Sequence, residues 1–134
     1  MSRRPTNYVS YNTLGNDMSS KADDQKLEIT ESEDFDNFIA LSFQTVCVLY
    51  VHAKWCQPCK QIAPRYLKMA DHYATEKVFL RKLNGEDDIC ADKGIRRFIT
   101  AFPTFLIFKN GNVVKTIVGG DLEGVENVIL SLKN

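Results

Sequence analysis

At positions 53–60 the chain reads Ala-Lys-Trp-Cys-Gln-Pro-Cys-Lys, so that Cys56 and Cys59 are separated by two residues. This stretch follows a run of strand-forming residues and precedes a helical pattern. A pair of cysteines at this spacing, placed between a strand and a helix, is typical of a dithiol–disulfide redox site. The stretch therefore predicts a strand that passes into a helix and carries redox chemistry at the junction.

The expected chemistry follows from the start of that helix. If Cys56 lies at or just before the first helical turn, its sulfur faces unsatisfied backbone N–H groups and the positive end of the helix dipole. Both favour the thiolate, which is the nucleophile in thiol–disulfide exchange. Cys59, one turn later, can then attack a mixed disulfide without a second encounter. Pro58 fits this arrangement, because proline is tolerated in the first turn of a helix.

The composition indicates a single soluble domain. The 134 residues are enough to bury a core without disulfide cross-links. The 17 Lys and Arg residues balance the 17 Asp and Glu residues, which argues against a nucleic acid or a membrane surface as the partner. No apolar run approaches the roughly 18 residues that a membrane-spanning helix needs. We therefore expect a cytoplasmic protein. Targeting to an organelle is the alternative, although Asp17, Asp23 and Asp24 count against it because such peptides avoid acidic residues. We also expect a monomer, with pairing of two copies through the apolar groove around the site as the alternative.

The two remaining cysteines are predicted to fill the core. Four cysteines are too few and too unevenly placed for a disulfide scaffold. Cys47 lies in an apolar run and Cys90 in an apparent helix, so both are interpreted as small core residues, with a regulatory thiol as the alternative. A structural zinc site needs two close pairs of ligands. Cys56 and Cys59 form the one close pair, with His52 and His72 as possible further ligands, so we expect no zinc site. We expect no other cofactor either.

The first 26 residues differ in composition from the rest of the chain. They are rich in Ser, Asn, Asp and Thr and show no sustained apolar period, which predicts a flexible tail. A segment that docks on a partner is the alternative. The folded domain is therefore expected over residues 27–134.

Within that domain, strand and helix patterns alternate. Strands are predicted over 27–29, 45–52 and 78–83, and an Asn110–Gly111 turn predicts a hairpin of strands over 105–108 and 113–118. Helices are predicted after a capping box of Thr30 and Glu33 (or a rival cap at Ser32), after Cys56 with a kink at Pro64, over 89–98, and after a cap at Asp121. This order predicts an α/β fold, in which a mixed central β-sheet is flanked by helices on both faces.

The run Trp55–Lys60 resembles the Trp-Cys-Gly-Pro-Cys-Lys signature of the thioredoxins, with Gln57 in place of the usual glycine. Further matches follow in the order of the family: Pro64, Lys82-Leu83-Asn84, Phe102-Pro103-Thr104, Phe108-Lys109-Asn110-Gly111 and Val118-Gly119-Gly120. The resemblance covers roughly residues 27–134. It implies the thioredoxin fold and a protein dithiol–disulfide oxidoreductase.

The resemblance also implies roles for individual residues. Cys56 is implied as the attacking cysteine and Cys59 as the resolving one, with a redox-silent pair as the alternative. Pro103 matches the family's cis-proline, which would bring the backbone of Phe102 next to the sulfurs. Client proteins are then expected to contact Trp55, Gln57, Pro58, Phe102, Pro103, Gly119 and Gly120. For the two glycines, turn chemistry alone is an equal alternative.

Two residues depart from the family pattern. Tyr50 stands where many thioredoxins keep a buried aspartate, which is thought to help remove the proton from the resolving cysteine, and a phenol with a pKa near ~10 is a poor base at neutral pH. Lys82 matches the lysine that pairs with that aspartate. We expect Lys82 to lack a carboxylate partner, and to bond the Tyr50 hydroxyl or turn towards water. His52 stands where an aromatic residue is common, and it is either a packing residue or a source of proton transfer in place of Tyr50.

These features predict a protein that reduces disulfides in client proteins through Cys56 and Cys59. A thioredoxin reductase or a glutathione-linked system would recharge it. One alternative is a disulfide oxidant or isomerase, which the missing secretion signal disfavours. The other is a redox-weak binding or scaffolding module of the same fold, which Tyr50 favours and the intact run Trp55–Lys60 disfavours. The segment from Asn84 to Pro103 is longer than usual, so the range of clients is not carried over.

Overall fold

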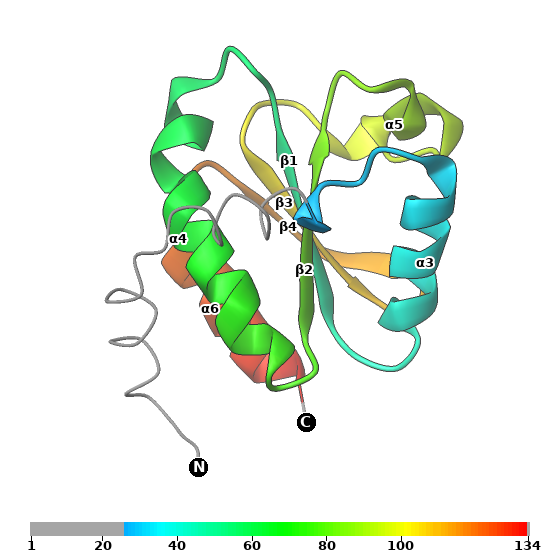
Figure 1. Ribbon diagram of the computed structural model, residues 1–134, viewed down its shortest axis with the longest axis vertical. Coiled ribbons are helices and arrows are strands. Elements are labelled where there is room, and N and C mark those ends of the chain that lie inside the picture. Colours follow the sequence, from blue (N-terminus) through cyan, green and yellow to red (C-terminus); the bar gives the residue numbers. More distant parts are fainter. Residues whose placement is uncertain (1–25, 134) are drawn as a thin grey trace.

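The computed structural model describes residues 26–133, which form three layers (Figure 1). A four-stranded sheet makes the middle layer. Helices α4 (Gln57–Ala74) and α6 (Leu122–Leu132) cover one face, and α3 (Ser32–Ser42) and α5 (Asp88–Asp92) cover the other. The predicted α/β fold with helices on both faces is confirmed. The predicted tail, apart from Lys26, lies outside the described residues.

The sheet combines parallel and antiparallel pairing. Its strands are β1 (Cys47–His52), β2 (Phe79–Asn84), β3 (Thr104–Lys109) and β4 (Asn112–Val118), in the spatial order β2-β1-β3-β4. Strand β1 is parallel to β2 and antiparallel to β3, and β3 and β4 form a hairpin. The hairpin turns at Asn110 and Gly111, whose φ angles of 54° and 81° are the positive values that an Asn-Gly turn uses. The mixed sheet and the hairpin are therefore as predicted.

The two central strands are buried on both faces, which explains their nearly continuous apolar sequences. Alternate residues enter two separate core clusters. One lies under α4 and α6 and includes Val48, Tyr50, Phe105 and Ile107; the other lies under α3 and includes Cys47, Leu49, Val51, Leu106 and Phe108. Full burial of one such side chain contributes about 1.5–3 kcal/mol. The two clusters therefore form the hydrophobic core on the two faces of the sheet.

The helix that follows β1 begins and continues as predicted. Cys56 is the N-cap of α4, Pro58 lies in its first turn, and Pro64 lies inside it. Helix α6 also begins as predicted, because Oδ1 of Asp121 accepts a hydrogen bond of 2.9 Å from the backbone N–H of Gly124.

The predicted start of α3 was wrong. The N-cap is Glu31, and Asp34 supplies the carboxylate that closes the capping box. Oδ2 of Asp34 accepts from the backbone N–H of Glu31 at 3.0 Å and from that of Thr30 at 3.2 Å. The Asp34 side chain, which is shorter than that of Glu33, accepts from both N–H groups. The helix therefore uses neither Thr30 with Glu33 nor Ser32 as its cap.

Two further predictions need correction. The helix expected over 89–98 is divided into α5 and a short 3₁₀ helix, η1 (Arg96–Phe98), because Gly94 adopts a φ of 72° and turns the chain between them. The strand expected over 27–29 is a single bridge between Glu28 and Lys82, while Leu27 is helical. The backbone N–H of Ile29 donates to the carbonyl of Lys82 at 2.8 Å, which fixes this segment beside β2.

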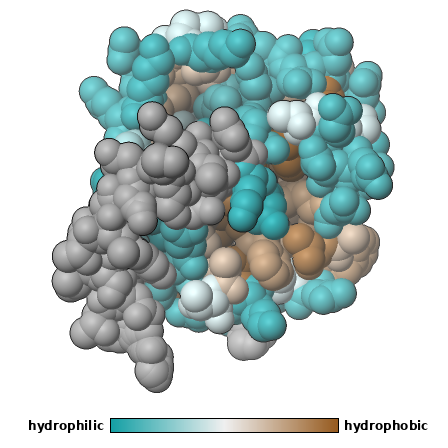
Figure 2. Space-filling model, viewed as in Figure 1, coloured by the Kyte–Doolittle hydropathy of each residue, from teal (hydrophilic) through white to brown (hydrophobic). Residues whose placement is uncertain are grey.

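The surface is largely polar. Figure 2 shows a mostly hydrophilic face, on which hydrophobic residues gather near the end of α3 and the start of β2. Phe43, which follows α3, is 62% exposed. Within residues 26–133, no helix has both the length and the apolar character that crossing a membrane requires.

Candidate active site

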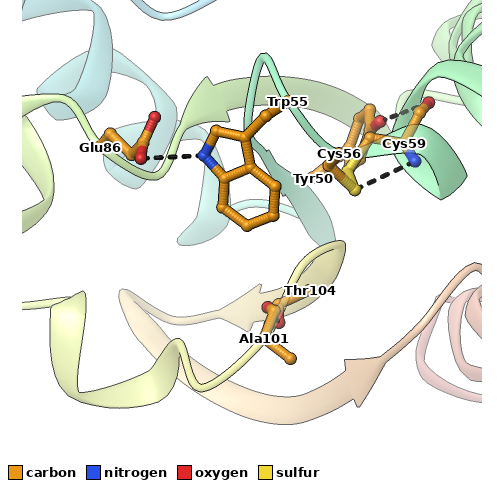
Figure 3. Close-up of a disulfide and its surroundings, with 7 residues drawn as sticks. All are labelled: Tyr50, Trp55, Cys56, Cys59, Glu86, Ala101 and Thr104. Carbon is orange, nitrogen blue, oxygen red and sulfur yellow. Dashed lines mark hydrogen bonds between the residues drawn. A yellow bond between two sulfur atoms is a disulfide. The ribbon is translucent and has the colours of Figure 1, made fainter.

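The two cysteines of the Cys-x-x-Cys stretch are joined in a disulfide at the N-terminus of α4 (Figure 3). Their Cα atoms lie 5.3 Å apart. Sγ of Cys56 also accepts a hydrogen bond of 3.2 Å from the backbone N–H of Cys59. The Cys56 sulfur therefore takes the place of a capping oxygen and lies at the positive end of the helix dipole. Gln57 and Pro58, between the two cysteines, are exposed.

Tyr50 lies directly beneath the pair. Its hydroxyl donates a hydrogen bond of 2.9 Å to the backbone carbonyl of Cys59 (Figure 3). Its ring, only 2% exposed, stacks on Phe105 at 5.2 Å between ring centroids and packs against Tyr66 at 4.8 Å. A buried side chain of β1 thus holds the first turn of α4 in place.

Lys82 does not lack a carboxylate partner, and that prediction was wrong. Its Nζ lies 3.7 Å from Oε1 of Glu28. The same carboxylate contacts Nε2 of His52, at 3.1 Å from each of its oxygens. The prediction failed because Glu28 reaches Lys82 through the bridge beside β2, a contact between residues that are far apart in the sequence.

Trp55 lies at the surface beside the disulfide. It is 63% exposed, and its Nε1–H donates to Oε2 of Glu86 at 3.0 Å (Figure 3). The Phe102 ring meets the indole edge to face at 5.5 Å. An open pocket of about 480 Å³ adjoins both rings, and its other lining residues are Gly85, Arg96, Ile99, Thr100 and Ala101.

The loop before β3 contains the cis peptide bond between Phe102 and Pro103. The Thr104 hydroxyl donates to the carbonyl of Ala101 at 2.6 Å and closes this loop (Figure 3). The backbone N–H of Gly119 donates to the carbonyl of Pro103 at 2.8 Å. The structure therefore brings Pro103 and Gly119 together. Gly120 lies against α4, since a Cβ there would be 3.3 Å from Cγ2 of Ile62.

The other two cysteines are free thiols inside the core, as predicted. Cys47 and Cys90 are each 0% exposed. Burial raises the pKa of each thiol to about 11, because a thiolate loses its solvation there. Burial also raises the pKa of Tyr66 well above its usual value. These three groups stay protonated at neutral pH.

Sequence reasoning missed two residues next to the site, Glu28 and Glu86. Glu28 belongs to a short segment that was interpreted only as a strand, and Glu86 to a polar turn after β2. The match of Lys82 to a lysine that needs an acidic partner was a signal for Glu28. For metal ions, no group of three or more His, Cys, Asp or Glu side chains within residues 26–133 is arranged to hold one.

Comparison with known proteins gives a consistent result. The family model Thioredoxin matches residues 26–131. Thioredoxin 1 of Plasmodium falciparum is 32% identical over 101 residues, which are 75% of this chain and 91% of that protein. Among solved structures, the thioredoxin NaTrxh of Nicotiana alata has a TM-score of 0.69 at 26% identity, covering 81% of this chain and 92% of that one. The thioredoxin of Malassezia sympodialis has a TM-score of 0.65 at 32% identity, covering 78% of this chain and 88% of that one.

The matched residues include the disulfide at the start of α4, the cis-proline loop before β3 and all four strands of the sheet. Proteins of this family act on disulfide-containing clients and are reduced by thioredoxin reductase. The chain therefore belongs to the thioredoxin family, and its Cys56–Cys59 pair makes it a protein-disulfide reductase of the thioredoxin type.

Proposed function

We propose that Cys56 attacks disulfides in client proteins and that Cys59 resolves the mixed disulfide that results. The observation that carries this assignment is the position of Cys56 at the N-cap of α4, where its sulfur accepts the N–H of Cys59. The same N–H and the helix dipole stabilise a thiolate at Cys56 once the pair is reduced. Cys59 lies in the first turn of α4 and is only 3% exposed.

The reaction has two exchange steps. The Cys56 thiolate attacks one sulfur of the client disulfide, which forms a mixed disulfide and releases the other client sulfur as a thiolate. Cys59 then loses its proton and attacks the Cys56 sulfur, which releases the second client sulfur. Two electrons pass from the dithiol to the client, and the protein is left with the Cys56–Cys59 disulfide. A thioredoxin reductase or a glutathione-linked system then returns two electrons to the pair.

The client is expected to lie across the surface formed by Trp55, Phe102 and Gly119. The cis-proline loop at Phe102 and Pro103 leads into β3, and we expect a client segment to add to the backbone of this loop as a strand. The hydrogen bond between Gly119 and Pro103 keeps this backbone in place. The exposed indole of Trp55 offers apolar area at the edge of the same surface. Gln57 and Pro58, which lie between the two cysteines in the sequence, are exposed and available to a client.

The alternatives account for fewer of these features. A binding or scaffolding module has no need of a cysteine pair at a helix N-terminus, where the thiolate is stabilised. A disulfide oxidant or isomerase would use the same pair, but no feature of the site favours that direction. A reductase is therefore the function that the site supports best.

The proposal is tested by reduction of insulin, with dithiothreitol as the source of electrons. The wild-type protein should accelerate the precipitation of the reduced insulin chains, and Cys56→Ser should abolish that acceleration. In a separate reaction without dithiothreitol, reduced Cys59→Ser should form a mixed disulfide with insulin that persists until dithiothreitol is added, because no second thiol resolves it. If Cys56→Ser kept its activity, or if Cys59→Ser formed no mixed disulfide, the assigned roles would be wrong.

A further inference from the structure

Three charged or titratable side chains form a cluster on the α4 side of the sheet, next to the active site. The carboxylate of Glu28 contacts Nε2 of His52 at 3.1 Å and Nζ of Lys82 at 3.7 Å. The side chains of Glu28, His52 and Lys82 are 23%, 17% and 12% exposed. Charges that lie this far from solvent interact more strongly than charges on an open surface. The cluster is therefore an electrostatic feature of the site itself.

The register of the sheet connects this cluster to the cysteines. Lys82 is the neighbour of both Glu28 and Tyr50 across the sheet. His52 follows Tyr50 by two residues in β1, so the two side chains lie on the same face, with ring centroids 5.4 Å apart. The Tyr50 hydroxyl in turn bonds the carbonyl of Cys59. A continuous series of contacts thus runs from Glu28 to the first turn of α4.

The chemistry of Cys59 makes this connection important. When Cys59 attacks the mixed disulfide, its thiol must lose a proton, yet the residue is only 3% exposed. A buried thiol keeps its proton unless a base or a positive charge is close. The resolving step therefore needs a proton acceptor near the base of the site.

The titratable groups that meet here differ in their capacity to accept that proton. From α4 come the two cysteines and Tyr66, which stays protonated because burial raises its pKa well above the usual value. From β1 come Tyr50 and His52, from β2 comes Lys82, and from the segment before α3 comes Glu28. A phenol is a poor base at neutral pH, and a lysine ammonium is only a donor. Imidazole is the side chain that takes up and releases a proton near neutral pH.

We propose that His52, held by Glu28, accepts by way of intervening water the proton that Cys59 loses in the resolving step, and that Lys82 positions the Glu28 carboxylate. This inference rests on the proposed function of Cys56 and Cys59. With a neutral imidazole, the charges of Glu28 and Lys82 cancel. When His52 takes up the proton, the cluster gains one positive charge while Cys59 becomes a thiolate, and the attack on Cys56 then releases the client thiolate. The proton passes to solvent from His52, whose side chain is partly exposed.

Glu28 acts here as a positioning residue. Its carboxylate faces Nε2 of His52, which assigns that nitrogen the N–H and leaves Nδ1 as the accepting nitrogen. The carboxylate also stabilises the imidazolium that forms. Tyr50 carries no negative charge at its position in β1. Glu28 supplies one nearby, from the segment before α3.

The test separates the attack by Cys56 from the resolution by Cys59. In stopped flow, the reduced protein is mixed with excess 5,5′-dithiobis(2-nitrobenzoate), whose two nitrothiobenzoate groups leave in successive steps and absorb light. The first phase reports the attack by Cys56, and its rate is proportional to the reagent concentration. The second reports the displacement by Cys59, and its rate is independent of that concentration. Both rates are measured between about pH 5 and pH 9, the range in which an imidazole titrates.

Glu28→Gln should slow the second phase by about tenfold at pH 7, because His52 then loses the carboxylate that orients it and stabilises its cation, which is a part of the roughly 10²–10⁴-fold that a positioned base contributes. Its first phase should change less than twofold. Glu76→Gln is the matched control, because Oε2 of Glu76 pairs with Nε2 of His72 at 3.2 Å at the far end of α4, and both of its rates should equal those of the wild type. His52→Gln keeps a side-chain N–H for Glu28 but no titrating base. It should therefore lose the inflection that the imidazole gives to the second phase.

Two results would overturn the inference. One is a second phase with the wild-type rate and pH profile in both Glu28→Gln and His52→Gln. The other is an equal slowing of both phases, which would mark a general loss of structure. His52→Gln decides the matter if Glu28→Gln does not fold. If the wild-type protein itself showed no second phase, the proposed roles of Cys56 and Cys59 would fail instead, so the two failures can be told apart.

Discussion

Tyr50 shows how one residue gives the site a different support. Its ring fills the core between Phe105 and Tyr66, and its hydroxyl holds the carbonyl of Cys59. The position therefore supplies packing and a hydrogen bond to the helix, whereas an aspartate would supply charge. The charge is found nearby, in Glu28, whose carboxylate meets Lys82.

For single residues, the sequence predicted those roles that depend only on residues nearby in the chain. Cys56 as a helix cap, Asp121 as a second cap and Gly111 in the hairpin turn were all predicted, because their signals lie within a few residues. The partner of Lys82 was not predicted. Ion pairs between distant segments depend on how the strands align, which short stretches of sequence do not encode.

The two core thiols should be unreactive in the native protein. Because burial raises the pKa of Cys47 and Cys90 to about 11, each thiol is protonated at pH 8, and only about one in a thousand molecules carries the thiolate. In the reduced protein, iodoacetamide should therefore modify Cys56 at pH 8 and leave both core thiols unmodified. Their reaction should appear only as the pH rises towards 11. Peptide mass spectrometry across a pH series measures this.

Unfolding in guanidinium is the control for these thiols, since all four cysteines should then react at pH 8.

The raised pKa values of Cys47 and Cys90 also make the folded state less stable at high pH. An ordinary thiol of the unfolded chain ionises near pH ~8.5, so the stabilisation is complete below that value and is lost as the pH rises through about 11. Modification of native Cys90 at pH 8 would contradict its role as a core residue.

Among the elements, those with long or strong local patterns were predicted best. Helix α4 is 18 residues long and has apolar residues at helical spacing along its length. It forms although Pro64 lies inside it. The segment between β2 and β3 was predicted less well. A helix expected over 89–98 ends early because Gly94 takes a positive φ, which a periodic apolar pattern alone does not reveal.

The contact between the turn after β2 and the cis-proline loop makes Gly85 a test of how these segments support the site. A Cβ on Gly85 would overlap Cε1 of Phe102 and would lie 2.9 Å from Cγ1 of Val51. Gly85→Ala should therefore displace Phe102, lower the free energy of unfolding by about 1–3 kcal/mol and slow the reduction of insulin. Thermal unfolding and the insulin assay measure the two effects.

Gly94→Ala is the matched control. Its added Cβ would meet no heavy atom within 4 Å, but its φ of 72° makes alanine strained. This variant should lose stability while it reduces insulin at the wild-type rate. A Gly85→Ala protein with unchanged stability and unchanged activity would show that Phe102 adapts at no cost, and that the loop is not held by this contact.

For the whole molecule, the fold class was predictable because many weak signals agree. Alternating strands and helices, an Asn-Gly hairpin and a final amphipathic helix all indicate the same layered architecture. The site lies at the carboxyl end of β1, where α/β sheets commonly place their chemistry. The charged cluster could not be predicted in this way, since it is formed by three segments that meet only when the sheet has formed.

The protein's central property is the reducing power of its cysteine pair, and the most direct measurement is its equilibrium with a glutathione redox buffer. Trp55 is the single tryptophan of the chain and lies beside the disulfide, so its fluorescence reports the state of the pair, with Cys56→Ser as the control. A protein-disulfide reductase should have a reduction potential clearly below that of glutathione. A potential at or above that of glutathione, or the absence of any equilibration, would contradict the function proposed for Cys56 and Cys59.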